Sequence, residues 1–330
     1  MSSASLKLKI RQFYWEAGSR RLPVGMGCAM IGREGNGETA LANTLELLTK
    51  AYSSGIRYFD TAAAYGNSEV LLGHFMNQIE RTSVFIATKA PFPYKEKGAH
   101  AAFEVFKRTF YESFERLRTD YIDLYHIHDT ESYAVGVEQV LPFLEERKKE
   151  GMIGAIGLGT RSLVAHEQAM LDGIIDASLC YFEYNLLSTA AKRILPCAKE
   201  QGVAFINAST LMPGFLVSYS GERVELSEER ESYINKQVLK RHRLIQGMKK
   251  LCGEMGIDIL AAAMQYGLFQ PDIDLTLVGI SKLKELQSAE SLLSAAIYPE
   301  QWAALTRLQE SHRFVHVQDE YAIYPFITKE

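Results

Sequence analysis

The stretch RYFDTAAAYGNSE, residues 57–69, contains the parts of one strand–loop–helix unit in order. Its first residues form a short apolar run that ends in a carboxylate, Asp60. Small residues and Tyr65 follow, and then Asn67 and Ser68, which are preferred N-cap residues, precede an apolar helical pattern. The stretch therefore predicts a strand ending in an acid, a tight loop with a tyrosine, and a helix. It leaves open whether Asp60 and Tyr65 serve packing or chemistry.

The same alternation of strand and helix recurs along the whole chain. Short apolar runs predict strands at residues 24–31, 57–62, 84–89, 122–128, 152–160, 177–184, 203–209 and 275–280. Amphipathic helical patterns lie between them, for example at residues 38–55, 67–79, 101–119, 136–151 and 281–293. Continuous apolar runs are typical of strands buried on both faces of a parallel sheet. Eight alternating units predict an α/β fold, a (β/α)8 TIM barrel in which residues 1–330 form a single domain.

One segment interrupts this alternation. Residues 212–238 are long, polar and acidic in the middle, and they predict a large loop after the seventh strand. Loops at that end of the strands belong to the functional face of a barrel. From Pro299 onward we expect one more helix and then an irregular tail.

The composition narrows the class of protein. The chain has 330 residues, of which 47% are hydrophobic and 23% charged, as expected for a globular protein with a large core. Its formal net charge of −4 argues against a nucleic acid partner. No run of about 18 apolar residues occurs and the start has no apolar signal region, so we expect no membrane segment. The four cysteines form no C-x-x-C pair, which favours a cytoplasmic location and gives no indication of a metal site.

Three polar residues end successive predicted strands: Asp60, Lys89 and His128. Tyr65 lies in the loop that follows the first of these strands. Because the carboxyl ends of barrel strands meet at one mouth, we expect the four side chains to lie close together. An Asp–Lys ion pair could be purely structural, although a buried pair is weak evidence of stabilisation. The ordered set of four groups favours a reaction centre.

These four groups suit the transfer of a hydride to or from a carbonyl carbon. Reduction needs a proton donor at the carbonyl oxygen, and the reverse oxidation needs a base there. Tyrosine has an unperturbed pKa of about 10, and the ammonium of Lys89 would lower the pKa of Tyr65 by favouring the phenolate. Asp60 would keep Lys89 charged and oriented, and His128 would hydrogen-bond the substrate oxygen. His126 lies on the same strand face, so periodicity alone does not choose between the two histidines.

The motifs DTAAAYG (residues 60–66), IATK (86–89) and DYIDLYHIH (120–128) resemble the signatures of the aldo-keto reductase family. The resemblance extends over about residues 24–293 and implies an NAD(P)-dependent barrel oxidoreductase acting on a small-molecule carbonyl or sugar substrate. It implies that the catalytic tetrad consists of Asp60, Tyr65, Lys89 and His128.

Departures from the family pattern suggest a branch. HIHDTESY (residues 126–133) lacks the Trp-Pro pair that often follows the catalytic histidine, and Gly159 with Thr160 replaces a Ser-Asn pair. Tyr181 stands where the family has a glutamine that contacts the nicotinamide amide. The chain thereby resembles the aldose 1-dehydrogenase (L-galactose dehydrogenase-like) branch. The resemblance implies oxidation of the anomeric hydroxyl of a sugar to a lactone.

The resemblance also assigns cofactor contacts near the ends of the last three strands. Residues 207–216 match a family loop over the pyrophosphate, and residues 278–293 match the segment that receives the adenosine phosphate at a helix N-terminus. The implied contacts are Tyr181, Ser209, Leu211, Gly214, Gly279, Ile280, Ser281, Lys282, Glu285 and Ser288.

The choice between NAD and NADP depends on the same helix. Glu285 takes a position where the family often has an arginine for the 2′-phosphate of NADP. An acid there would repel that phosphate and suits a free ribose hydroxyl, so Glu285 favours NAD. The positive charge of Lys282 acts in the opposite direction.

Three alternatives are compatible with parts of the same sequence. GNGETA (residues 35–40), with Asp60 beyond it, has the order of a dinucleotide-binding motif in a doubly wound fold. An NADPH-dependent general aldehyde or ketone reductase would share all the catalytic groups. A non-catalytic nicotinamide-binding regulatory subunit would share the barrel, although an intact set of four groups argues against lost catalysis.

Overall fold

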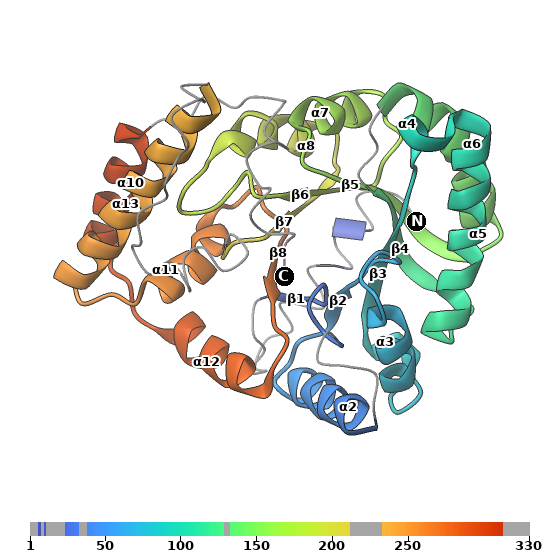
Figure 1. The fold of residues 1–330 in the computed structure, drawn as a ribbon, viewed down its shortest axis with the longest axis horizontal. Helices are drawn as coiled ribbons and strands as arrows, with labels where there is room; N and C mark the ends of the chain where they lie inside the picture. The colour runs from blue at the N-terminus through green and yellow to red at the C-terminus, as the bar shows by residue number, and fades with distance from the viewer. Residues whose placement is uncertain are drawn as a thin grey trace.

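The computed structural model describes residues 6, 7, 10, 24–32, 38–128, 133–211 and 233–312. Eight parallel strands form a closed barrel in chain order, and the first strand pairs with the last (Figure 1). The strands are β1 Gly25–Gly27, β2 Tyr58–Asp60, β3 Phe85–Pro91, β4 Ile122–His128, β5 Ile153–Thr160, β6 Ala177–Tyr181, β7 Ala204–Ala208 and β8 Leu275–Gly279. The predicted TIM barrel is confirmed, and the doubly wound alternative is wrong because an open sheet has two unpaired edge strands.

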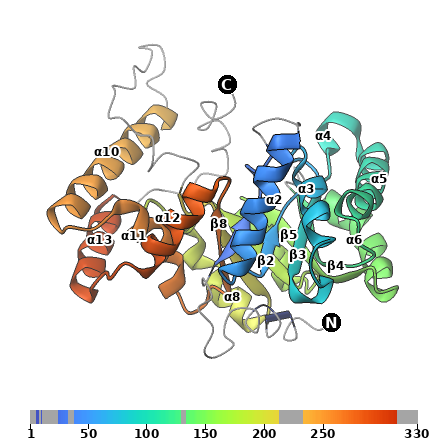
Figure 2. The same ribbon diagram turned by 90° about the horizontal axis from the view of Figure 1, so that it is seen from below.

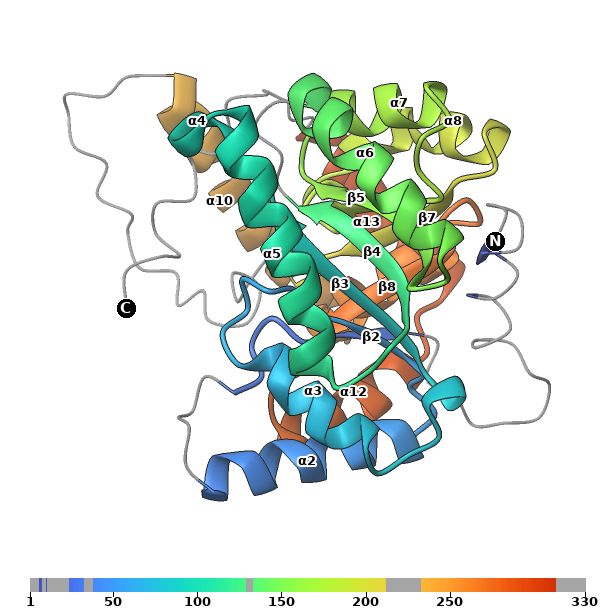
Figure 3. The same ribbon diagram turned by 90° about the vertical axis from the view of Figure 1, so that its right-hand side faces the viewer.

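Helices surround the strands on the outside of the barrel (Figure 1). They are α2 Glu38–Ser53, α3 Ser68–Met76, α4 Tyr94–Lys97, α5 Ala99–Leu117, α6 Tyr133–Lys149, α7 Leu163–Leu171, α8 Leu195–Glu200, α10 Tyr233–Glu254, α11 Ile259–Gln265, α12 Leu283–Ser294 and α13 Pro299–Ser311. In side view, α10, α11, α12 and α13 gather on one side of the barrel (Figure 2). On another side, α5 packs between α3 and α6 (Figure 3).

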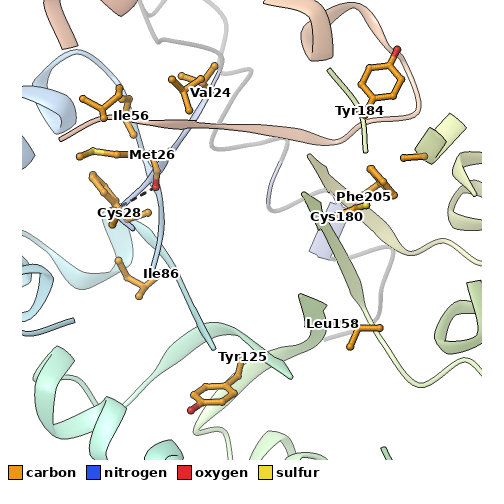
Figure 4. Close-up of a cluster of buried hydrophobic side chains, with 14 of the residues drawn as sticks. Val24, Met26, Cys28, Ile56, Ile86, Tyr125, Leu158, Cys180, Tyr184 and Phe205 are labelled. Atoms are coloured by element: carbon orange, nitrogen blue, oxygen red, sulfur yellow. Dashed lines mark hydrogen bonds between the residues drawn. The ribbon is translucent and has the colours of Figure 1, made fainter. Parts of the chain in front are cut away.

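Alternation along the strands produces two apolar layers. Side chains that point into the barrel form an inner core, to which most strands contribute small or medium-sized residues and β2 and β3 contribute Tyr58 and Phe85. Side chains that point outward pack against the helices and form a larger outer core. Figure 4 shows part of this outer layer, including Met26 of β1, Ile86 of β3 and Phe205 of β7. The inner layer stops below the carboxyl ends of the strands, where polar residues take over.

Two predicted segments lie partly outside the described residues. Of the predicted loop 212–238, residues 212–232 are not described, and residues 233–238 belong to α10 instead of the loop. The predicted final helix is confirmed as α13, which begins at Pro299. The irregular tail after it lies outside the described residues from position 313 onward.

Three described residues near the amino terminus lie at the opposite end of the barrel. Leu6 and Ile10 are fully buried and belong to the inner core. Between them, the Lys7 ammonium is 3.7 Å from the Asp274 carboxylate, which precedes β8. These contacts place the three residues at the amino-terminal ends of the strands, away from the functional mouth. None of the described helices is both long enough and apolar enough to cross a bilayer.

Candidate active site

The predicted catalytic residues come from three neighbouring strands. Asp60 ends β2, Lys89 lies near the end of β3, and His128 ends β4. Each shares its strand face with an inner-core residue two or four positions earlier, so each side chain points into the barrel. Tyr65 is half-buried in the loop between β2 and α3. The strand order therefore determines which side of the mouth is polar.

Asp60 and Lys89 form a buried ion pair. The two residues are 4% and 1% exposed, and the Lys89 Nζ donates a hydrogen bond to Asp60 Oδ1 and another, of 2.7 Å, to the Thr61 carbonyl. Burial raises the pKa of the Asp60 carboxyl, and the adjacent Lys89 ammonium opposes this. Burial alone would lower the pKa of Lys89, but the charges of Asp60 and Tyr65 raise it above its ordinary value. Lys89 is therefore held as an ammonium.

Tyr65 and His128 lie beside this ion pair. Lys89 Nζ is 5.1 Å from the centroid of the Tyr65 ring. The rings of Tyr65 and His128 are perpendicular, with centroids 6.0 Å apart. The structure thus brings all four predicted residues to one place, where a cation, a phenol and an imidazole lie side by side. Their roles in catalysis stay a prediction.

The loop that carries Tyr65 is anchored at both ends. Before Tyr65, the Ala63 amide donates to the Lys89 carbonyl at 3.1 Å. After it, the Ser68 hydroxyl donates to the Cys28 carbonyl at 3.0 Å. The carboxylate of Glu69, only 1% exposed, accepts hydrogen bonds from Thr88 at 2.5 Å and from Arg116 at 2.7 Å. These contacts tie the start of α3 to the strand that carries Lys89.

Sequence reasoning missed Ser68 and Glu69 as supports of the site. Ser68 was expected only as an N-cap type, and an acid in the first turn of a helix is ordinary, because it complements the helix dipole. The one available signal was position: Glu69 lies in the first turn of the helix that follows the short loop from the end of the second strand, and this end of the barrel forms the mouth. Its burial and its two partners depend on the packing of α3 against β3 and α5.

Depth in the barrel separates the two histidines of β4. His126 pairs in register with Lys89, is fully buried, and packs over Gly157, where an added Cβ would lie 2.3 Å from His126 Nδ1. Neither ring nitrogen of His126 has a hydrogen bond of normal geometry. Burial and the charge of Lys89 lower the pKa of His126 well below its usual value, against a weak backbone interaction with Leu158. His126 is therefore neutral and enclosed, whereas His128 lies one step nearer the mouth and is 8% exposed.

The other half of the mouth carries little side-chain volume. Gly27 of β1 and Gly279 of β8 are register partners that point inward, and an added Cβ on Gly279 would meet nothing within 4 Å. On β7 the corresponding residue is Ala208, whose register partner on β6 is the half-buried Tyr181. We call the arc formed by Gly27, Gly279 and Ala208 the bare wall. Its small residues would allow a flat nicotinamide ring to approach the backbone there, and this contact stays a prediction.

The predicted cofactor residues follow the ends of β6, β7 and β8, next to the bare wall. Ser209 has a φ of 60°, a left-handed conformation that aims the chain away from the strand. Leu211 is half-buried, and Gly214 lies outside the described residues. Ile280 is 1% exposed and belongs to the outer core, so only its backbone can approach a ligand at the mouth. Ser288 is exposed on α12, and its hydroxyl donates to the Lys284 carbonyl.

The start of α12 is occupied by its own glutamate. One oxygen of the Glu285 carboxylate accepts hydrogen bonds from the Ser281 amide at 2.7 Å, the Ser281 hydroxyl at 2.9 Å and the Lys282 amide at 3.2 Å. Helix N-termini attract anions because their amides lack partners in the helix. Here a carboxylate of the chain itself takes the position predicted for a phosphate.

Comparison with known proteins agrees with this architecture. Residues 23–310 match the model of the Aldo/keto reductase family. The chain is 29% identical to L-galactose dehydrogenase of Arabidopsis thaliana over 80% of its length and 82% of that protein. It is 27% identical to D-threo-aldose 1-dehydrogenase of a Pseudomonas species, over 86% and 92% of the two chains.

A solved aldo-keto reductase from Bacillus halodurans, in its holo form, has the same fold. The two structures superpose with a TM-score of 0.66 over 87% of this chain and 91% of that one, at 23% sequence identity. The closed barrel and the matched family model together define the class: the chain belongs to the aldo-keto reductase family. It is an NAD(P)-dependent oxidoreductase, as the tetrad motifs predicted.

Proposed function

We propose that the chain is a sugar (aldose) 1-dehydrogenase that oxidises the anomeric hydroxyl of an aldose to a lactone with a nicotinamide cofactor. The observation that carries the redox chemistry of this proposal is the convergence of the Asp60–Lys89 ion pair, Tyr65 and His128 at the mouth. The names of two relatives, L-galactose dehydrogenase and D-threo-aldose 1-dehydrogenase, support the sugar as substrate class. The departures at Gly159, Thr160 and Tyr181 support the same branch.

Each of the four residues has a distinct task in this oxidation. The Tyr65 oxygen takes the proton of the anomeric hydroxyl as that oxygen becomes a carbonyl. The Lys89 ammonium, 5.1 Å from the ring, favours the phenolate that accepts this proton. His128 donates a hydrogen bond to the substrate oxygen and holds it near Tyr65. The hydride leaving the same carbon is accepted by the nicotinamide ring when the cofactor is bound, which balances the reaction as lactone, reduced cofactor and one proton.

NAD is the favoured cofactor in this proposal. The Glu285 carboxylate caps the start of α12, where it would face the 2′-phosphate of NADP. Two anions at one helix terminus repel each other, whereas a ribose hydroxyl can donate a hydrogen bond to a carboxylate. The positive charge of the Lys282 ammonium reduces this preference for NAD, but the Glu285 carboxylate remains at the start of α12.

A general NADPH-dependent aldehyde or ketone reductase is the second candidate. The specific observation in its favour is the mouth itself, because the same Tyr65 hydroxyl can donate a proton to a carbonyl in the reverse direction. A regulatory barrel that binds a cofactor without turnover is the remaining alternative.

Two measurements separate these functions. Titration with NAD and NADP, followed by quenching of protein fluorescence, should show tighter binding of NAD. A panel of free aldoses and aromatic aldehydes, followed by the absorbance of reduced cofactor, should then show NAD-linked oxidation of an aldose. Faster NADPH-linked reduction of the aromatic aldehydes would identify a general reductase. Binding without any turnover would favour the regulatory alternative, and absence of binding to either cofactor would contradict the whole proposal.

A further inference from the structure

Another buried ion pair joins the ends of two neighbouring strands at the mouth. Arg161 directly follows β5, and Glu183 lies two residues beyond the end of β6. Arg161 Nε is 2.6 Å from Glu183 Oε1, and the residues are 5% and 1% exposed. Replacing a buried ion pair by apolar residues of similar volume often leaves the stability of the folded protein unchanged. Stability alone therefore does not explain these charges. The proton transfer described above makes no use of them.

The ion pair contacts the aromatic side of the mouth. Arg161 Cζ lies 5.6 Å from the centroid of the Phe182 ring, within the range of a cation–π contact. The Phe182 ring meets the Tyr181 ring edge to face, with centroids 5.2 Å apart and an interplanar angle of 82°. Contacts therefore run from Glu183 through Arg161 and Phe182 to Tyr181.

Phe182 has a backbone conformation that bulky residues rarely adopt. Its φ is 68°, in the left-handed region where glycine would be less strained. The turn is held by two hydrogen bonds: Phe182 N donates to the Ala208 carbonyl at 3.3 Å, and Asn185 Nδ2 donates to the Phe182 carbonyl at 2.7 Å. Strain of this kind is concentrated at functional sites. The aromatic residue at this strained position therefore points to a role for its ring.

That role is found at the bare wall. Tyr181 points inward at the top of β6 and packs against the inner core, and its register partner is the small Ala208. The inward positions near the ends of β7, β8 and β1 are Ala208, Gly279 and Gly27, which carry no large side chain. A flat ring lying on the bare wall would therefore have the Tyr181 ring at its edge.

We propose that Arg161 and Glu183 are a positioning pair. The pair holds the Phe182 ring and, through it, the Tyr181 ring, against which the bound nicotinamide ring packs. This inference rests on the proposed function and adds to it a support of the binding surface. Neither Arg161 nor Glu183 touches the reacting atoms. Loss of the pair should therefore weaken cofactor binding more than it slows the chemical step.

The test combines a variant that removes the charge of Glu183 with a variant that removes the Tyr181 ring. Glu183→Gln should raise the Kd of the cofactor that the wild type binds more tightly by about three- to tenfold, the effect of losing one aromatic packing contact. Tyr181→Ala should raise this Kd by a similar factor. Because the pair acts through Tyr181, adding Glu183→Gln to Tyr181→Ala should change the Kd little further. A fully additive double variant would overturn the inference, since it would show that Glu183 acts independently of Tyr181.

Two controls keep the result interpretable. Asp123→Asn removes a buried carboxylate that pairs with the half-buried Arg81. Asp123 lies about 16 Å below His128 along β4, so the variant should leave the Kd unchanged. If Glu183→Gln does not fold, the double variant Arg161→Met, Glu183→Leu avoids an unpaired buried charge and should show the same rise in Kd. A folded variant with wild-type Kd and KM would overturn the inference while leaving the proposed function intact. A wild type that binds no nicotinamide cofactor would overturn both.

Discussion

Lys89 connects the stability of the mouth with its chemistry. Its ammonium is 1% exposed and has its hydrogen-bond partners within the barrel, the Asp60 carboxylate and the Thr61 carbonyl. Burial alone would lower the pKa of this group, but the charges of Asp60 and Tyr65 raise it. Lys89 therefore keeps its positive charge near neutral pH, and its ammonium lies close to Tyr65.

Removing this cation should separate the two effects. Lys89→Met leaves the Asp60 carboxylate buried without its partner, so we expect a loss of about 3–5 kcal/mol in the free energy of unfolding. Turnover should fall by about 10²- to 10⁴-fold, as for loss of acid–base catalysis. Adding Asp60→Asn should restore much of the stability in a urea titration and none of the turnover. Recovery of turnover in the double variant would contradict the role assigned to Lys89.

A histidine behind the mouth provides a pH dependence with a defined sign. His166 on α7 is fully buried, with Nε2 2.9 Å from the Thr160 carbonyl and Nδ1 2.8 Å from the Ser178 hydroxyl. Burial lowers its pKa from 6.5 to about 4. Between these values the unfolded chain binds a proton that the folded protein does not. Stability should therefore fall as the pH is lowered through this window, by about 3 kcal/mol in total.

The variant His166→Asn should remove this part of the pH dependence. The free energy of unfolding, measured by urea titration from pH 7 to about pH 4, should fall less steeply in the variant than in the wild type. His126 is also buried with a lowered pKa, but it is present in both proteins and cancels in the difference. An equal pH dependence of the unfolding free energy in the two proteins would show that His166 takes up its proton as readily in the folded protein as in the unfolded chain.

At the level of elements, we propose that the end of β8 and the start of α12 set the preference between NAD and NADP. The sequence predicted a helix N-terminus beside the last strand and an acid in its first turn. It did not predict that Glu285 would fold back onto the amides of Ser281 and Lys282, because a capping contact depends on the exact start of a helix. In the structure the Glu285 carboxylate already accepts hydrogen bonds from these amides, so a phosphate at this position would have to compete with it for the same N–H groups.

Exchange at this position should change the cofactor preference. Glu285→Gln removes the repulsion, and Glu285→Arg adds a partner for the 2′-phosphate, so affinity for NADP should rise in this order, reaching about tenfold or more for arginine. Glu290→Arg, on the same helix but away from its start, changes the charge equally and should have little effect. Fluorescence titration of both cofactors measures the ratio. An unchanged ratio in Glu285→Arg would place the adenosine phosphate elsewhere.

The polar half of the mouth was more predictable than its supports. Asp60, Lys89 and His128 were located because each lies at or near the end of a strand, and the closure of the barrel brings strand ends together whatever the loops do. His126 and His128 could not be separated, since two-residue periodicity gives them the same face, and only depth distinguishes them. Glu69 and the Arg161–Glu183 pair were missed because their partners are distant in sequence and ordinary in type.

In the molecule as a whole, the two ends of the barrel differ. The polar residues of the mouth lie at the carboxyl ends of the strands, and the opposite end is packed with apolar residues. Eight alternating units made the fold predictable, since apolar strand runs and amphipathic helices have no other arrangement that closes in chain order. The closure of the far end was not predictable. Leu6 and Ile10 enter the inner core there, beneath strands that begin far along the chain, and nothing in their local sequence indicates this.

The far end should therefore affect stability alone. Leu6→Ala removes a fully buried side chain from the inner core, so we expect a loss of about 2–5 kcal/mol in the free energy of unfolding. Leu171→Ala makes the same chemical change at a residue 59% exposed and should cost less than about 0.5 kcal/mol. Below the unfolding transition, both variants should keep the wild-type KM and kcat. A raised KM in Leu6→Ala would show that the two ends of the barrel are coupled.

We assign the proton transfer at the mouth to Tyr65, and the variant Tyr65→Phe isolates this step. The variant keeps the ring that packs against Lys89 and His128 and removes only the hydroxyl. We predict that kcat falls by about 10²- to 10⁴-fold in the variant. Cofactor Kd, measured by fluorescence titration on the same preparation, should stay within a factor of about two. Turnover at the wild-type rate with unchanged cofactor binding would contradict this assignment.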